Sequence, residues 1–206
     1  MSNQTAPHRL AFGSVAANRS ALPVLGLLPF LLITFVIAWG ILGLYIFLPD
    51  QMAGAFGQLT GQHPLFFLAV WAPAIAAFLV VLYHTGVSGL ARFLSRFLLW
   101  RCCPWWYAFL IVGIPLVFIA GAAMRGTLLT DPFPFATPAS MLIALGLAAI
   151  KGPMEEFGWR GLALPLLQRK LAPLWAGLVL GVIWGLWHLP AFMLSGTQQS
   201  QWAVAP

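Results

Sequence analysis

The chain has 206 residues, of which 61% are hydrophobic and only 7% are charged, with a formal net charge of +6. A soluble domain is close to half apolar and a quarter charged, so this composition excludes an ordinary soluble protein and predicts an integral membrane protein. Because the chain has so few charges, its net positive charge is better explained by basic loops on one side of a bilayer than by nucleic-acid binding. No nucleic-acid partner is predicted.

Five segments are long and apolar enough to cross a bilayer, which takes about 20 mostly apolar residues. In chain order they are 22–48, 65–83, 104–124, 138–167 and 171–194. The first exceeds the ~7–15 residues of a signal-peptide core and is therefore predicted to be retained. The predicted fold class is all-α, a polytopic membrane helix bundle of about five spanning helices that includes a broken, charge-bearing fourth helix.

Basic residues gather in alternate segments around these spans, as Arg9, Arg19, Arg92, Arg96, Arg101, Arg169 and Lys170. The loop at 49–64 has no lysine or arginine. By the positive-inside rule, the N-terminus and the loops near 95 and 170 are cytoplasmic, which predicts a multi-pass protein of the cell membrane. Residues 86–101 form either a short helix on the cytoplasmic surface or a plain basic loop.

The fourth predicted span contains the segment KGPMEEFGWRG, residues 151–161. Its charged residues are Lys151, Glu155, Glu156 and Arg160. Ionisable groups are costly in hydrocarbon, so an intramembrane cluster indicates function. A straight helix from 138 to 170 would be roughly 50 Å long, against a core of about 30 Å. Breaks are therefore predicted at Gly152-Pro153 and at Pro165, where proline removes a helical hydrogen bond.

Helical spacing separates the two adjacent glutamates. Glu156 and Arg160 are four residues apart and are predicted to form an ion pair on one face. Glu155 points roughly 100° away from Glu156, and its link to Lys151 is interrupted by the Gly-Pro break. A buried carboxylate without a full partner is suited to accept a proton near neutral pH, so Glu155 is the candidate general base.

The fifth predicted span supplies a partner, His188, in the segment VIWGLWHLP. If spans four and five fold back about Leu171–Ala172, Glu155 and His188 reach similar depth, because Glu155 lies 16 residues before Leu171 and His188 lies 16 after Ala172. The two side chains could then hold a water between them. Trp184, four residues before His188 on the same face, would wall this site. Structural alternatives are a salt-bridge cluster that pins the helices and a histidine that only hydrogen-bonds another helix.

At these residues the sequence resembles the CPBP intramembrane proteases, also called the Abi or type II CAAX prenyl protease family. EEFGWRG is similar to the family's Glu-Glu-x-x-x-Arg motif, and WGLWHLP to its second motif, an aromatic residue followed four positions later by His. The resemblance covers about 138–195. It implies cleavage of peptide bonds in or beside the membrane, in prenylated CAAX proteins for eukaryotic members and in peptide maturation or bacteriocin immunity for bacterial ones.

The resemblance also implies roles for individual residues. Glu155 would activate the attacking water, His188 would assist, and Glu156 and Arg160 would support them, with Trp184 and Trp159 at the substrate cavity. The expected partners are the lipid bilayer and a peptide or protein substrate, lipid-modified in the prenyl protease case. Members are often called metalloproteases, so a divalent metal such as zinc is left open, with Glu155 and His188 as its ligands if any; a zinc site usually takes three protein ligands.

The chain departs from the family in one respect. A later motif, His followed four residues on by Asn or Asp, has no counterpart after His188. The predicted organisation is therefore a cytoplasmic tail at 1–21, a C-terminally incomplete membrane domain at 22–195 and a short tail at 196–206. The leading hypothesis is an intramembrane endopeptidase. A non-catalytic immunity or peptide-binding membrane protein and a small transporter are the alternatives.

Overall fold

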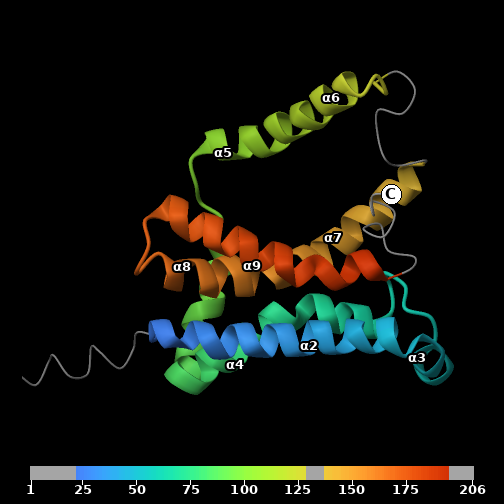
Figure 1. Cartoon of the computed structure of the whole chain (residues 1–206). Helices are drawn as coiled ribbons and strands as arrows, with labels where there is room; N and C mark the ends of the chain where they lie inside the picture. Colours follow the sequence, from blue (N-terminus) through green and yellow to red (C-terminus); the bar gives the residue numbers. More distant parts are fainter. Residues whose placement is uncertain (1–21, 129–136, 195–206) are drawn as a thin grey trace, which may run out of the picture. The chain divides into compact units, whose positions relative to one another are not determined.

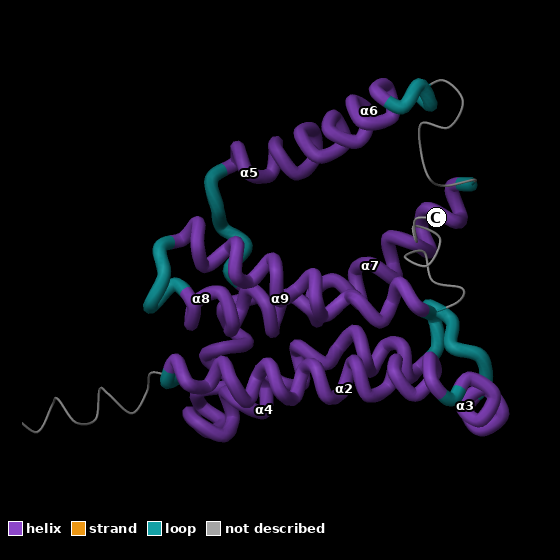
Figure 2. Tube along the Cα trace, viewed as in Figure 1, coloured by secondary structure: helices purple, strands orange, loops and turns teal. Residues whose placement is uncertain are grey.

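The structure is a computed structural model that describes residues 22–128 and 137–194. Within those two ranges the chain forms helices joined by turns, with no strand (Figures 1 and 2). The predicted all-α class is confirmed. The predicted tails at 1–21 and 196–206 lie outside the described residues.

The helices follow the predicted order along the chain. The α-helices are α2 (Leu27–Phe47), α3 (Pro49–Phe56), α4 (Pro64–Ser95), α5 (Pro104–Ala108), α6 (Ile114–Met124), α7 (Pro138–Gly158), α8 (Leu164–Leu167) and α9 (Pro173–Met193). Two short 3₁₀ turns are η1 (Val24–Gly26) and η2 (Arg96–Leu98). Two π-helical segments are η3 (Phe109–Gly113) and η4 (Trp159–Ala163).

Four helical stretches are long and apolar enough to cross a membrane: Val24–Phe47, Pro64–Leu98, Pro104–Met124 and Pro173–Met193. They overlap the first, second, third and fifth predicted spans, but the second continues past its predicted end at residue 83 to Leu98, across a kink at Gly86. The predicted fourth span is helical from α7 to α8, but its lysine and glutamates interrupt the apolar run. The loop predicted at 49–64 contains the short helix α3, and the basic segment after residue 86 is helical rather than a plain loop.

Of the two breaks predicted in the charge-bearing helix, the one at Gly152-Pro153 is absent, and the one at Pro165 lies next to an irregular turn. α7 remains helical through Pro153, and the irregular turn is η4, which ends two residues before Pro165. The third span repeats this arrangement, since η3 ends two residues before Pro115. A proline ring clashes with the carbonyl four residues earlier, and a wider π turn relieves that clash.

The chain divides into two compact units, one made of Met1–Phe93 with Lys151–Pro206 and the other of Leu94–Ile150. In the second unit, the apolar span of α5, η3 and α6 has no buried residue. The N-terminus of α7 in the same unit carries a reciprocal cap. The Thr137 and Ser140 side-chain oxygens each accept the other residue's backbone N–H at 3.1 Å, which satisfies two donors that a helix start leaves free.

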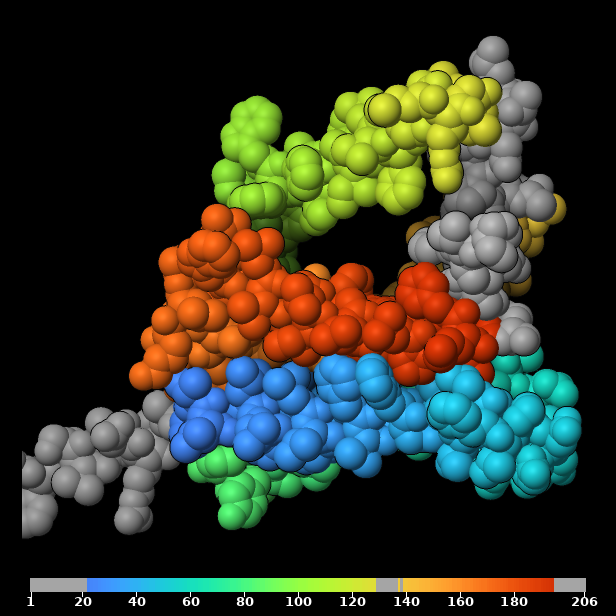
Figure 3. Space-filling model, viewed as in Figure 1, coloured from blue at the N-terminus to red at the C-terminus, as the bar shows by residue number. Residues whose placement is uncertain are grey.

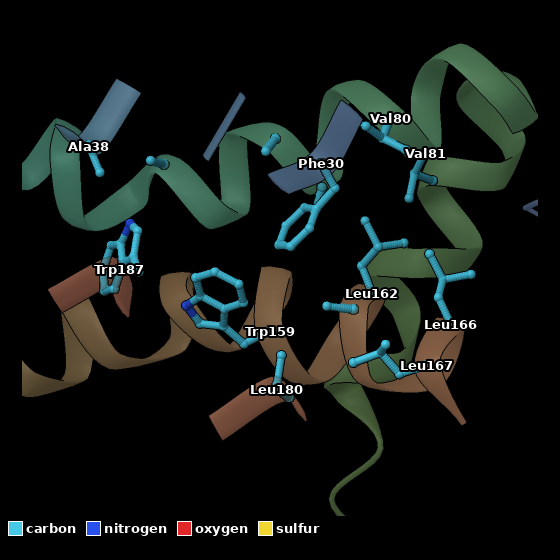
Figure 4. Close-up of a cluster of buried hydrophobic side chains, with 14 of the residues drawn as sticks. Phe30, Ala38, Val80, Val81, Trp159, Leu162, Leu166, Leu167, Leu180 and Trp187 are labelled. Carbon is cyan, nitrogen blue, oxygen red and sulfur yellow. The ribbon is translucent and has the colours of Figure 1, made fainter. Parts of the chain in front are cut away.

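The first unit holds the core, built where α2, α4, η4, α8 and α9 meet (Figure 4). Trp159 of η4 is fully buried between the rings of Phe30 and Trp187, at centroid distances of 5.4 and 5.8 Å. Figure 3 shows side chains of α2 and α9 meeting along their lengths. The buried face of α4 is small, with Ala69, Ala72, Ala76 and Ala77. Small residues let neighbouring helices approach closely in a membrane protein.

Candidate functional site

The indole of Trp184, on α9, contacts three of the residues predicted for the site. Its ring centroid lies 4.5 Å from the His188 ring and 5.9 Å from the guanidinium carbon of Arg160. Its N–H is near enough to the carboxylate of Glu155 to act on it as a hydrogen-bond donor. Trp184 is therefore the side chain through which the α7–η4 segment and α9 meet at this site.

Glu155 lies near the C-terminal end of α7 and is partly buried. It forms no salt bridge within the described ranges, although Glu156, Arg160 and Lys151 lie close enough to act on it electrostatically. An indole N–H is a neutral donor and leaves the carboxylate without a full counter-charge. Glu155 thus keeps lone pairs free to accept a proton from a water.

Glu156 and Arg160 form the ion pair that their spacing predicts. Arg160 Nη1 donates to Glu156 Oε1 at 2.5 Å, one helical turn apart. Their side chains are 41% and 52% exposed. A pair this exposed contributes less than about 1 kcal/mol to stability. Its stronger effect is on geometry, because it holds the guanidinium where it reaches Trp184.

The ring of His188 has a defined tautomer. Its Nδ1 lies 2.9 Å from the carbonyl oxygen of Trp184, and a carbonyl only accepts, so Nδ1 carries the hydrogen. Nε2 therefore carries a lone pair and accepts hydrogen bonds. Within the described part of the chain, no hydrogen bond joins His188 to Glu155. Trp184 touches both, which places them beside the same indole.

The two tryptophans predicted at the cavity lie in different environments. Trp184 is 38% exposed and can contact a substrate, whereas Trp159 has no exposed surface. Trp159 packs in the core instead, because η4 turns it between α2 and α9. The structure adds Trp187, which sequence reasoning missed. Its ring centroid lies 4.7 Å from the His188 ring, and its carbonyl accepts the indole N–H of Trp39 at 3.2 Å.

Trp187 therefore fixes the His188 ring from the buried side. The signal that could have found it is the sequence WGLWHLP itself, where a second aromatic residue directly precedes the histidine. The burial of Trp187 could not be predicted from the sequence, because it depends on how α2 packs against α9.

A zinc site is not formed by the described residues, since no three His, Cys, Asp or Glu side chains among them come together in a metal-binding group. Typical protein zinc sites use at least three protein ligands. Glu155 and His188 alone do not meet that requirement.

Two comparisons with known proteins found similar proteins. Residues 137–205 match the family model "Type II CAAX prenyl endopeptidase Rce1-like". A curated relative, "CAAX prenyl protease 2" of Methanococcus maripaludis, is 28% identical over 92 residues, 45% of this chain. The chain spans about a third, 33%, of the length of that relative. No solved structure matches significantly. Both matches support the CPBP/CAAX protease family and confirm the resemblance seen in the sequence.

Proposed function

With the CAAX protease family as premise, we propose that this protein is a membrane-embedded endopeptidase that cleaves membrane-associated peptides or proteins by a glutamate-activated water. The single observation that carries the proposal is the convergence of Glu155, Arg160 and His188 on the indole of Trp184. All four residues lie inside the segment that matches the family.

Each residue has a step in the proposed hydrolysis. Glu155 accepts a proton from a water as its oxygen adds to the scissile carbonyl, and that proton then goes to the leaving amine. His188, through the lone pair of Nε2, assists by accepting a hydrogen bond from the attacking water. Glu156 and Arg160 hold the helix and the guanidinium in place. Trp184 aligns the Glu155 carboxylate and forms the wall that the substrate meets.

The substrate proposed is a peptide whose scissile bond is brought to the bilayer by a lipid group, as in prenylated CAAX sequences. The name of the Methanococcus relative supports this substrate class. A lipid anchor confines the peptide to the membrane, where Glu155 lies, and so raises its local concentration. An unmodified peptide of the same sequence should therefore be cleaved less efficiently.

Membrane insertion is proposed with the N-terminus in the cytoplasm and several spans. The four apolar helices support membrane localisation. The basic residues that precede the first span and follow the second and fourth support the orientation.

The direct test is peptide cleavage by purified protein in lipid vesicles, using a farnesylated CAAX-type peptide with a fluorescence readout. Glu155→Gln should lower kcat by a factor of about 10²–10⁴, the usual contribution of a general base. Asp50→Asn, a carboxylate change on α3, is the matched control. Equal rates of cleavage by wild type and Glu155→Gln would contradict the proposed mechanism. Peptide binding without cleavage by wild type would favour the non-catalytic peptide-binding alternative.

A further inference from the structure

Lys151 lies on α7 one turn before Glu155, and its ammonium has three partners from another part of the fold. Nζ donates to the carbonyl of Gly61 at 2.6 Å. It also lies 4.8 Å from the ring centroid of Phe67 and 5.2 Å from that of Phe66. Both distances are within the ~6 Å range of a cation–π contact. The charge is thus held by a carbonyl and two aromatic faces.

The loop that supplies the Gly61 carbonyl to Lys151 is itself fixed by hydrogen bonds. His63 accepts the N–H of Leu65 at 3.1 Å through Nδ1, which caps the start of α4. Its Nε2 donates to the Phe56 carbonyl at 2.8 Å and ties this cap to the end of α3. The Tyr45 hydroxyl donates to the Gly57 carbonyl at 3.2 Å. The 57–63 loop that presents Gly61 is therefore held at both ends.

A second contact between the same two helices lies two turns further on. A Cβ at Gly158 would come within 2.4 Å of Pro73 Cβ, so α7 and α4 touch there. Lys151 precedes Gly158 by seven residues, and Phe66 precedes Pro73 by seven. Seven residues are about two helical turns, so α4 and α7 run in the same direction, in register, over this stretch.

Glu155 lies between these two contacts and on the same face of α7. At about 100° per residue, Lys151, Glu155 and Gly158 fall within roughly 60° of one another. Lys151 and Glu155 also interact electrostatically. Rotation of α7 that would turn Glu155 away from Trp184 must break the Lys151 contacts or the Gly158 contact.

We propose that Lys151 is a positioning residue: its ammonium, bound by Gly61, Phe66 and Phe67, fixes the rotation of α7 that presents Glu155 to Trp184. This role rests on the proposed function for its consequence in catalysis, but its geometry can be tested without any activity. The segment between Lys151 and Gly158 is fixed at both ends, and the carboxylate is presented from its middle.

The first measurement is the rate at which a maleimide alkylates Glu155→Cys, in a background where Cys102 and Cys103 are serine. Lys151→Met should change that rate about tenfold, the scale of one charge-assisted hydrogen bond with its cation–π contacts. Lys151→Arg keeps the charge and should restore the wild-type rate. Lys170→Met, a change at the chain's other lysine, which is exposed, should have no effect.

A second variant keeps the test valid if Lys151→Met folds poorly. Phe67→Leu removes the nearer ring and keeps the lysine, and it should move the alkylation rate in the same direction by a smaller factor. Phe67→Tyr keeps the aromatic face and should restore it. Rates within twofold of wild type in both Lys151→Met and Phe67→Leu overturn the proposal.

The catalytic consequence is a separate readout. Lys151→Met should lower kcat with little change in KM, and Lys151→Arg should rescue it, because the proposed role of Lys151 is to position Glu155 and not to bind the substrate. If Glu155→Gln cleaves as well as wild type, the proposed function fails while the alkylation rates still decide the role of Lys151. If Glu155→Gln is inactive but the alkylation rates do not respond to Lys151, the function stands and this inference fails.

Discussion

Gly158 of α7 lies directly against Pro73 of α4, with no room for a side chain between them. A Cβ at position 158 would meet Pro73 Cβ at 2.4 Å, its carbonyl oxygen at 2.6 Å and its carbonyl carbon at 2.7 Å. Two of these atoms are backbone and cannot move aside as a flexible side chain would. The glycine in EEFGWRG is thus explained by packing rather than by backbone conformation, since only the Gly57, Gly86 and Gly126 backbones have positive φ in the described ranges.

Gly158→Ala should therefore destabilise the protein by about 3 kcal/mol, the upper end of the usual cost of overpacking. The measurement is thermal unfolding of purified protein in detergent micelles. Gly152→Ala is the matched control on the same helix, because a Cβ there meets nothing within 4 Å. It should be neutral or slightly stabilising, by up to about 1 kcal/mol. Equal melting temperatures for both variants would contradict the observed packing.

Thr34 carries a fully buried hydroxyl on α2 that has no hydrogen-bond partner within the described residues. Thr34→Val removes that hydroxyl and keeps the shape of the side chain, so it should stabilise the protein by about 1 kcal/mol. Thr34→Ser keeps the hydroxyl and loses a methyl group, so it should destabilise. The melting temperatures of the three proteins in one detergent decide the point. A lower melting temperature for Thr34→Val would show that the hydroxyl has a partner.

Much of the fold was predictable from the sequence because span length and apolarity are local properties. The third span was predicted at its observed bounds, Pro104–Met124. The helix α3 was missed because its eight residues are too short and too polar to predict a span, although Pro49 in its first turn and Asp50 beside it are helix-start signals. A break at Pro165 was predicted, and the π turn η4 lies just before that residue. The helical continuation through Pro153 was not predictable, because both prolines stand in a helical pattern.

The candidate site was likewise predictable only in part. The Glu156–Arg160 pair follows from a spacing of four residues on one helix. The partners of Lys151 lie about 90 residues away in the chain, and no local pattern points to them. Trp159 was predicted at the cavity from its place in the motif. Its burial depends on how α2 and α9 enclose it, which only the tertiary structure supplies.

The proposed orientation can be tested with the natural cysteines. Cys102 and Cys103 are the two cysteines of the chain, both are exposed, and both follow the basic segment predicted to be cytoplasmic. A membrane-impermeant maleimide should label them in inverted membrane vesicles and leave them unlabelled in intact cells. A Cys102→Ser, Cys103→Ser variant supplies the background. Labelling in intact cells alone would place this loop outside and reverse the proposed topology.

Trp184 makes two separable contributions to the proposed reaction, one through its indole N–H and one through its aromatic ring. Its N–H acts on Glu155 as a hydrogen-bond donor, while its ring contacts His188 and Arg160. Trp184→Phe removes only the donor, so kcat should fall about tenfold, the equivalent of one hydrogen bond of about 1.4 kcal/mol. Trp184→Leu also removes the aromatic face and should cost more. Trp175→Phe, at an exposed position on the same helix, is the matched control and should cleave as wild type does.

The double variant decides whether the Trp184 donor acts through Glu155. If the indole N–H aligns the carboxylate, Trp184→Phe should have no further effect on cleavage once Glu155→Gln has removed the base, because the two changes then remove the same interaction. Residual activities of Glu155→Gln and of the double variant should therefore agree within experimental error. If the losses multiply instead, Trp184 acts on the substrate independently of Glu155, and the alignment step assigned to its indole would have to be dropped.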